Sequence, residues 1–467
     1  MAVAVSLKPL NRVPGSFIFG NLEDFKNNRL ELLLRVKETC GEVGSFRLGP
    51  LSVLVVSSPH LAHTILVNHP QDFDGGPLVR NFMPLVGERS VIFLQGEPHR
   101  LQRKLLAPIF QPRRLAAFST TMVQFTLDTL ERWQDGQHID VVHEMGLLTM
   151  RVAGKVLFDV DFLNESPELN DAVITTVEHL EHMTSSMPPL PLFVPTARNR
   201  KALRALDTIS RSMKAMIDER RHHVRADSND LLSLLLQQRD DEGQPMDDGQ
   251  IRDHIMTFFA AGNETTAFTL SWVLYLLARH PEVHARVRHE VDSVLGGRPP
   301  TYEDLPALGY LLQVIKETLR LYPVVYMQAR CAVRDLEIDG YAIRKGQMLL
   351  IPPYCIHRDS EYFPEPERFD PERFSPEREK QIPRHAYMPF GAGPHTCIGN
   401  HFALMEAHLI MATLVQRLDF EMLAGQVVTP KVAAVTLQPS RYQMKLTHRP
   451  HQEEDVSRPR ARAAGGL

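Results

Sequence analysis

One cysteine in a glycine-rich loop near the C-terminus constrains this chain more than any other feature. Cys397 lies in the segment Tyr-Met-Pro-Phe-Gly-Ala-Gly-Pro-His-Thr-Cys-Ile-Gly, residues 387–399. Apolar residues follow it at helical spacing, namely Phe402, Leu404, Leu409, Ile410 and Leu414. The thiol therefore precedes a helix, where backbone N–H groups and the helix dipole favour an anion. Gly391, Gly393 and Gly399 leave room for backbone N–H groups to turn toward the sulfur.

Two interpretations of Cys397 follow from the residues alone. It could be a small buried cysteine in a loop-to-helix turn, or a thiolate ligand of haem iron. The pattern Phe-x-x-Gly-x-His-x-Cys-x-Gly, residues 390–399, resembles the haem-binding loop of the cytochrome P-450 family. The resemblance implies that Cys397 is the axial ligand of a haem b cofactor, with Phe390 and Gly391 beside the sulfur. It also implies that His395 reaches a haem propionate.

A long helix is predicted upstream of this loop. Asp247 can cap its start, and it runs to about His280, where a proline follows. A glycine inside a helix costs about 1 kcal/mol relative to alanine, so Gly262 needs a compensating role. Ala261 and Gly262 would let a flat cofactor approach the helix backbone.

The centre of this helix also carries a hydroxyl next to a carboxyl. Thr265 could simply donate a hydrogen bond to its own i−4 carbonyl, as many mid-helix threonines do. The stretch Ala-Gly-Asn-Glu-Thr-Thr, residues 261–266, resembles the oxygen-activation motif of the same family. The resemblance implies that Glu264 and Thr265 pass protons to the bound oxygen through positioned water.

A predicted helix beginning near residue 96 carries His99 and Arg103 on one face, because they are four residues apart. A solvated basic face is one interpretation. The resemblance instead implies that both side chains bind a haem propionate, and that Arg330 does so too. The surrounding region is locally basic through Arg100, Lys104, Arg113 and Arg114. It is either a solvated surface or, as in the resembled family, a docking site for an acidic ferredoxin or flavodoxin that works with its reductase.

A further helix, residues 311–320, contains Glu317 and Arg320 three positions apart. Such a pair is usually an exposed salt bridge of little energetic value. The apolar flanks indicate burial instead, where losing one partner is costly. In the resembled family this pair has a third partner, which Arg373 matches. We interpret the three residues as structural and not as catalytic.

The family places residues 77–94 over the distal haem face and a mobile lid at 183–195. Residues 324–327 face the substrate by the same resemblance. From the residues alone, these segments could equally be a surface loop and ordinary connections. The predicted substrate contacts are Phe82, Met83, Ile92, Met183, Phe193, Phe258, Val324 and Met327. They form an apolar set, which fits a fatty acid, a terpenoid or a polyketide-like metabolite.

Composition limits the remaining possibilities. The 467 residues carry 52 Lys and Arg against 56 Asp and Glu, a net charge of −4, which gives no reason to expect a nucleic-acid partner. The apolar N-terminus, residues 1–7, is too short for a membrane-spanning helix of about 20 residues. The other cysteines, Cys40, Cys331 and Cys355, show no metal-binding spacing and are interpreted as free thiols in a reducing compartment. These features predict a cytoplasmic protein without a transmembrane anchor.

We expect one haem domain over residues 1–467, with a disordered basic tail from about 448 to 467. The resemblance covers about residues 10–445 and implies a mainly helical α+β fold with the haem between the long helix and the Cys397 loop. It implies a monooxygenase that takes electrons from NAD(P)H through separate redox proteins. Two alternatives remain: a peroxide-using or isomerising haem-thiolate enzyme, and a haem sensor or carrier without turnover.

Overall fold

The computed structural model describes residues 7–80, 83–161, 167–185, 192–222, 230–433 and 435–450. Within these ranges the chain is mainly helical and has one six-stranded sheet and three smaller ones. The predicted α+β class is therefore confirmed. The predicted basic tail lies outside the described residues from position 451 onward.

The longer helices are α2 (Arg29–Cys40), α6 (Gly96–Leu106), α8 (Ser119–Arg132), α9 (Val141–Phe158), α11 (Pro167–Ser185), α12 (Ala197–His222), α14 (Asp248–Arg279), α15 (Pro281–Leu295), α16 (Gly309–Leu321) and α19 (Asn400–Arg417). The shorter ones are α1 (Leu22–Asn27), α3 (Pro59–His63), α4 (Gly76–Arg80), α5 (Met83–Val86), α7 (Pro112–Leu115), α13 (Leu231–Gln237), α17 (Pro353–Ile356) and α18 (Pro376–Glu379). Among the described residues, every helix is too short or too polar to cross a membrane.

The six-stranded sheet has the order β1-β2-β3-β9-β6-β4. Its strands are β1 (Asn11–Arg12), β2 (Val43–Leu48), β3 (Leu51–Val56), β4 (Phe73–Asp74), β6 (Gln328–Ala332) and β9 (Met348–Ile351). The small sheets contain β5 (His138–Asp140), β10 (Leu418–Met422) and β13 (Gln443–His448); β11 (Pro430–Ala433) and β12 (Thr436–Pro439); and β7 (Leu336–Ile338) and β8 (Tyr341–Ile343). Strands β2 and β3 form a hairpin around Gly49 and pair in register from Val43–Val56 to Leu48–Leu51.

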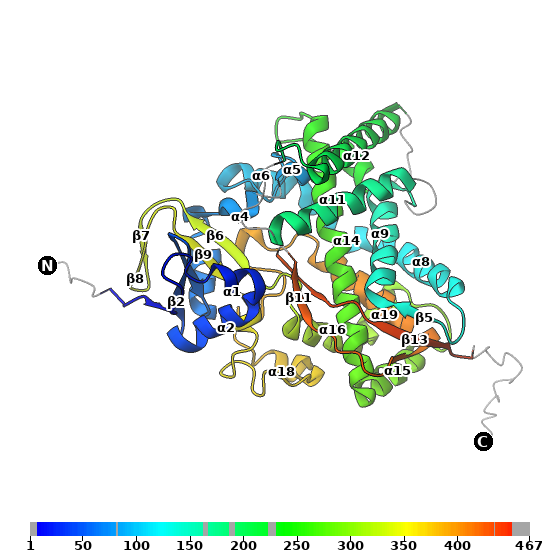
Figure 1. Cartoon of the computed structure of the whole chain (residues 1–467). Coiled ribbons are helices and arrows are strands. Elements are labelled where there is room, and N and C mark those ends of the chain that lie inside the picture. Colours follow the sequence, from blue (N-terminus) through cyan, green and yellow to red (C-terminus); the bar gives the residue numbers. More distant parts are fainter. Residues whose placement is uncertain are drawn as a thin grey trace, which may run out of the picture.

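Helix α14 runs through the middle of the molecule, with the six-stranded sheet to one side and α8 and α9 to the other (Figure 1). Its predicted start is confirmed, because Asp247 accepts a hydrogen bond from Gln250 N and the Gln250 side chain reciprocates. The helix ends at Arg279, with His280 as its C-cap. Helix α19 packs against α14 in a shared apolar core that also includes α8, α9, α15 and α16.

Candidate active site

A cavity of about 380 Å³ lies between the centre of α14 and the loop that carries Cys397. A narrower space of about 120 Å³ adjoins it and shares Ala261, Thr265 and Cys397 as walls. Aliphatic and aromatic side chains dominate both spaces, including Val79, Ile92, Phe110, Val156, Ile315, Leu319, Val324, Val325, Phe390 and Phe402. Together they form one apolar slot whose two faces are α14 and the Cys397 loop.

The loop presents Cys397 to this slot in a fixed conformation. Gly391 and Gly393 have φ angles of 76° and 72°, which side-chain-bearing residues rarely adopt. A Cβ at Gly393 would also collide with the carbonyl oxygen of Leu66. The backbone N–H of Cys397 donates to Phe390 O at 2.9 Å and closes the turn. Both glycines are therefore required for this loop.

The Cys397 thiol is open to the slot but enclosed by the surrounding protein. This enclosure raises the pKa of the Cys397 thiol, while the Gly399 N–H and the charge of Arg103 act in the opposite direction. The glycine-rich loop thus does direct a backbone donor at the sulfur. A metal ion bound there would reverse the balance, because a coordinating thiol is deprotonated.

One end of the slot gathers donors from three separate elements. The rings of His99 on α6 and His395 are in contact, tilted by 31° with centroids 4.0 Å apart, and His395 Nε2 lies 3.1 Å from Gln95 Oε1. Burial lowers the pKa of His395 to about 3, so the ring is neutral at neutral pH. Arg103 donates to Thr396 O at 2.8 Å. Arg330 lines the same end from β6, and burial lowers its pKa to about 10.

This donor set fits the carboxylates of a haem. The Arg330 side chain donates to the carbonyl of Ala329 at 2.8 Å, and among the described residues no carboxylate offsets the effect of burial on its charge. A buried cation without an anionic partner is costly, so an anion from a ligand would relieve that cost. A flat macrocycle with its propionates toward His99, Arg103, Arg330 and His395 would fill the apolar slot.

The centre of α14 forms the other face of the slot. Ala261, Gly262 and Thr265 line it, and a Cβ added at Gly262 would meet no atom within 4 Å. The small residues therefore do leave space above the helix backbone. The Thr265 hydroxyl donates to Ala261 O at 2.6 Å, which is the alternative that the sequence left open. Its lone pairs remain directed away from that bond and can accept one from a molecule in the slot.

Glu264 lies next to Thr265 on α14 and is half-buried. It is not among the residues that line the slot, whereas Thr265 and Thr266 are. The structure therefore brings Thr265, Cys397 and the donor cluster together and leaves Glu264 outside the slot lining.

The predicted substrate contacts divide into groups. Ile92 and Val324 line the larger space, and Phe258 lines the smaller one. Met327 instead packs in the core beneath the six-stranded sheet, because residues alternate sides in extended chain and Gln328 and Arg330 take the slot side.

Of three further predicted contacts, one is exposed and two lie outside the described part of the structure. Phe193 stands in a turn before α12 with its side chain 84% exposed. Phe82 falls outside the described residues. Met183 lies within α11, but its side chain is outside the described part of the structure.

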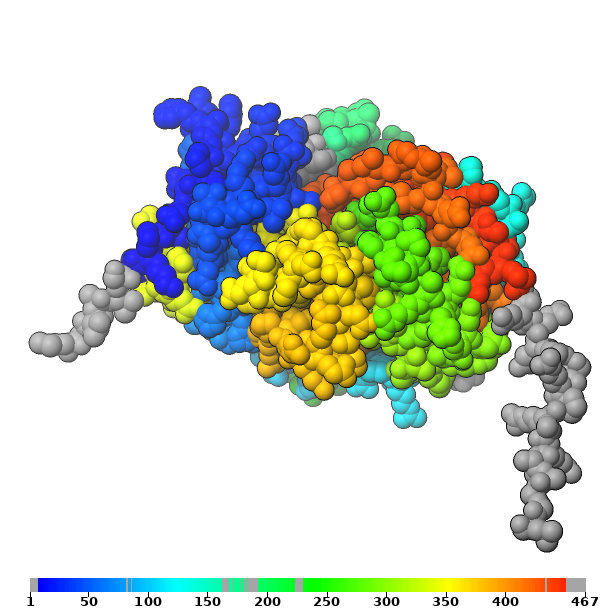
Figure 2. All heavy atoms as spheres, turned by 90° about the horizontal axis from the view of Figure 1, so that it is seen from below, coloured from blue at the N-terminus to red at the C-terminus, as the bar shows by residue number. Residues whose placement is uncertain are grey.

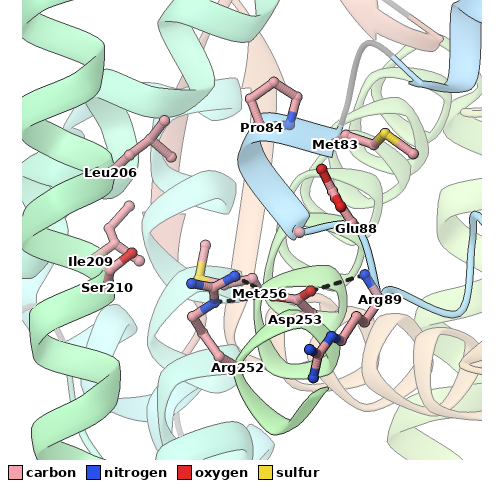
Figure 3. A pocket seen from close by; sticks show the side chains of 11 residues that line it. Met83, Pro84, Glu88, Arg89, Leu206, Ile209, Ser210, Arg252, Asp253 and Met256 are labelled. Atoms are coloured by element: carbon pink, nitrogen blue, oxygen red, sulfur yellow. Dashed lines mark hydrogen bonds and ion pairs between the residues drawn. The ribbon is translucent and has the colours of Figure 1, made fainter. Parts of the chain in front are cut away.

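Met83 lines a different pocket of about 350 Å³, between α5, α12 and α14 (Figure 3). Asp253 lines this pocket and accepts hydrogen bonds from Arg89 N at 3.0 Å and from the Arg252 side chain at 2.6 Å. Leu206 and Ile209 face it from α12. The segment 87–90 is also held to α14 by Ser90 and Thr257, whose hydroxyl oxygens are 2.7 Å apart. This fixed segment directs Met83 away from the slot.

Glu406, which lines the slot from α19, is a carboxyl that was not predicted from the sequence. Its side chain is fully buried, and burial raises its pKa to about 8, opposed only in part by the nearby Thr266 hydroxyl. The two side chains are close but fall short of hydrogen-bond geometry, and among the described residues neither Glu406 Oε2 nor Thr266 Oγ1 has another partner. A single acidic residue on the apolar side of a helix was the signal that could have found it.

Glu406 gives a pH prediction. An unfolded chain releases this proton from about pH 4.5, whereas the folded protein keeps it to about pH 8. The free energy of unfolding should therefore fall as pH rises across this window, by up to about 1.4 kcal/mol per pH unit. Glu406→Gln should flatten this slope in denaturant titrations at several pH values. The exposed Glu178→Gln control should keep it; an unchanged slope in Glu406→Gln would show that the carboxyl ionises freely.

The predicted structural trio lies behind the Cys397 loop. Glu317 and Arg320 on α16 are both fully buried, with oxygen–nitrogen distances of 2.7 and 2.9 Å. Arg373 approaches Glu317 at 3.4 Å, and Asp370 N donates to Glu317 at 2.9 Å. Arg320 donates in addition to the carbonyls of His357, Pro366 and Arg368. None of the three side chains lines the slot.

The locally basic surface is less basic than the sequence indicates. Arg100 pairs with Glu97, and Lys104 with Asp241 at 2.7 Å. Arg103 turns inward to Thr396. Arg113 and Arg114 on α7 remain exposed.

The fold and the slot thus define a protein that can hold a planar cofactor between a long helix and a cysteine loop.

Comparison with known proteins gives the family. The family model for Cytochrome P450 matches residues 11–446. Cyclooctat-9-en-7-ol 5-monooxygenase of Streptomyces melanosporofaciens is 38% identical, over 81% of this chain and 82% of that protein. Pentalenene oxygenase of Streptomyces avermitilis is 32% identical, over 88% and 91%. The solved structure of retinoic acid bound cyanobacterial CYP120A1 has a TM-score of 0.85 and 27% identity, covering 95% of this chain and all of that one.

The chain belongs to the cytochrome P450 family. It is a haem-dependent monooxygenase, which uses O₂, an organic substrate and electrons from redox partners. The resemblance drawn from the Cys397 loop and the centre of α14 is confirmed at the level of family, fold, cofactor and reaction class.

Proposed function

We propose that this enzyme inserts one oxygen atom from O₂ into a terpenoid-like hydrocarbon or alcohol, with Cys397 as the axial ligand of the haem. The observation that carries the proposal is the apolar slot, closed by Cys397 on one face and by Ala261, Gly262 and Thr265 on the other. When bound, the haem supplies O₂ binding and oxygen activation. Overall, O₂, two electrons and two protons convert a C–H bond into C–OH and release one water.

The side chains have distinct proposed roles. His99, Arg103, Arg330 and His395 hold the propionates and so set the position of the haem. Thr265 accepts a hydrogen bond in the slot while donating to Ala261 O, which positions a proton donor. Glu264 supplies protons from the solvent side. Phe390 and Gly391 shield the sulfur, and the apolar walls exclude bulk water.

The substrate class is supported by chemistry and by similarity. Ile92, Phe258 and Val324 contribute aliphatic and aromatic walls, and the polar groups concentrate at the propionate end. Two relatives are named for cyclooctat-9-en-7-ol and pentalenene. We propose that this enzyme hydroxylates or epoxidises a compact cyclic terpenoid, ahead of a fatty acid or a polyketide-like metabolite.

We propose a cytoplasmic enzyme that receives NAD(P)H electrons from a ferredoxin or flavodoxin and its reductase. The docking surface would centre on Arg113 and Arg114, since Arg100 and Lys104 are already paired with carboxylates. An acidic partner would bind there with an on-rate that falls as salt is added.

The first experiment is the absorption spectrum of the reduced, CO-bound protein, followed by oxygen-dependent product formation with supplied electrons. A strongly red-shifted Soret band supports Cys397 as a thiolate ligand. A panel of cyclic terpenes, fatty acids and macrolides, each analysed by mass spectrometry for a gain of one oxygen, tests the substrate class. Turnover of fatty acids alone would contradict the terpenoid assignment.

Thr265→Ala tests the proton relay. The variant should bind haem and substrate normally, because Thr265 contributes only one hydroxyl to the slot. Electrons should be diverted into hydrogen peroxide, with most of the coupling to product lost. The measurement is the ratio of product to NAD(P)H consumed. Ser271→Ala is the matched control, since this buried hydroxyl makes the same i−4 bond, to Ala267 O at 2.7 Å. Tight coupling in Thr265→Ala would make Thr265 structural.

A further inference from the structure

A fully buried histidine on α14 forms a hydrogen bond to α6. His254 has no exposed surface, and its Nε2 lies 2.9 Å from Oε1 of Gln102. Burial lowers the pKa of His254 to about 4, opposed only in part by the charge of Asp253, so the ring is neutral at neutral pH. A neutral imidazole carries one ring proton, and the partners of its two nitrogens therefore decide where that proton sits.

The proton of His254 lies on the nitrogen that faces α6. Among the described residues, His254 Nδ1 has no hydrogen-bond partner. A proton on Nδ1 would leave a buried donor without an acceptor, which costs more free energy than an unused lone pair. Nε2 therefore carries the proton and donates to Gln102 Oε1. The same bond orients the Gln102 amide with its oxygen toward the ring.

Helix α6 contacts both faces of the slot through two neighbouring side chains. Toward the Cys397 loop, Arg103 donates to Thr396 O at 2.8 Å. Toward α14, Gln102 accepts the hydrogen bond from His254 at 2.9 Å. The helix therefore connects the two faces at the propionate end of the slot, and a shift of α6 relative to α14 would move Arg103.

The other contacts between α6 and the region of α14 leave the orientation of α6 less well defined. Leu106 packs with Phe258 in one apolar cluster, and apolar contacts are non-directional. Lys104 pairs with Asp241, in the turn before α14, but both side chains are exposed and such pairs contribute little. Among the described residues, the bond that Gln102 accepts is the buried, directional contact between the two helices.

The surroundings of His254 are those of an apolar residue. Its ring stacks on Phe258 with centroids 6.3 Å apart, and Ile251 and Ile255 on the same helix are buried. Burying a polar ring costs free energy unless it is hydrogen-bonded, and an apolar side chain would fill the same space without that cost. The bond to Gln102 therefore contributes more to the direction of packing than to its strength.

We propose that His254 is a positioning residue, which holds α6 through Gln102 where His99 and Arg103 meet the haem propionates, and so raises the reduction potential of the haem. The inference rests on the propionate contacts proposed above. Ferric haem carries one more positive charge than ferrous haem, and each propionate is negative. Propionates that lose a nearby cation therefore stabilise the ferric state and lower the reduction potential.

Redox titration of the haem-loaded, full-length protein without substrate tests the proposal. His254→Phe keeps a ring against Phe258 and removes the donor, and Gln102→Met keeps the side-chain length and removes the acceptor. We expect each change to lower the equilibrium constant for haem reduction about tenfold, the size of effect typical of outer-shell partners and a negative shift of roughly 59 mV. Transfer of haem to apomyoglobin should become faster in both variants. His254→Gln keeps an N–H near the position of Nε2 and should behave like wild type.

His408→Phe is the matched control. His408 on α19 is also buried, burial also lowers its pKa to about 4, and its Nε2 lies 2.9 Å from Leu308 O. Helix α19 packs against α15, whose green surface is seen from below in Figure 2, whereas α6 lies at the top of Figure 1. The control variant should lose stability but keep the reduction potential of wild type.

Arg103→Ala separates this inference from the propionate contacts on which it rests. If Arg103→Ala keeps the potential and the haem of wild type, the propionate contact fails and the inference fails with it. If Arg103→Ala lowers the potential but His254→Phe and Gln102→Met do not, only the positioning role of His254 is overturned. That role is also overturned if His254→Gln or the His408→Phe control shifts the potential as far as His254→Phe. Gln102 is only half-buried, so Gln102→Met decides the case if His254→Phe does not fold.

Discussion

Replacing Cys397 by serine should abolish the red-shifted CO spectrum and reduce turnover to background. The slot offers no second thiol, since among the four cysteines only Cys397 lines it. A serine hydroxyl stays protonated at this site and is a poor ligand for haem iron. The measurements are the CO difference spectrum and oxygen-dependent product formation, both normalised to bound haem.

Cys40→Ser is the control for this prediction, because Cys40 lies at the end of α2, outside the slot. It should keep the spectrum and the activity of wild type. A Cys397→Ser protein with wild-type spectrum and activity would contradict the proposed ligand and return Cys397 to the status of an ordinary buried cysteine.

Glu317→Ala should cost the fold about 3–5 kcal/mol, because it leaves the fully buried Arg320 without its carboxylate. Arg320 also donates hydrogen bonds to the carbonyls of His357, Pro366 and Arg368. Its displacement would therefore loosen the segments that support the Cys397 loop. We expect a lower midpoint in denaturant unfolding and incomplete haem incorporation.

Asp207→Ala provides the comparison, since Asp207 pairs with Arg211 on an exposed face of α12. Its loss should change stability far less than the loss of Glu317. A Glu317→Ala protein that is as stable and as haem-loaded as wild type, but inactive, would contradict the structural role and indicate a catalytic one.

The parts of the site that the sequence predicted are those specified by local chemistry. Asp247 marks the start of α14 because a side-chain cap acts on the next three residues. The Cys397 loop was recognisable because its glycines stand at fixed spacing. They permit backbone conformations and a close contact with Leu66 that side-chain-bearing residues would not allow.

The parts that the sequence did not predict depend on how distant elements pack. Met83 faces a second pocket because Asp253 on α14 holds the segment after α5. Met327 faces the core because side chains alternate along the extended chain, and Gln328 and Arg330 are the ones that point toward the slot. Glu406 titrates unusually only because α14 and α19 together exclude water from it. None of these outcomes is encoded within a short window of sequence.

The hold of Asp253 on the segment 87–90 provides a marker for recognising related enzymes. Gly87 has a φ of 82°, and a Cβ there would collide with the Asp253 carboxylate. Only glycine is therefore compatible with this attachment, and Ser90 and Thr257 complete it. A chain with Gly-x-x-Ser ahead of the equivalent of α6 and Asp-x-x-x-Thr early in the long helix should share this geometry. From amino-acid sequences alone, this pair of patterns would separate relatives that attach the equivalent segment to the long helix in this way from relatives that do not.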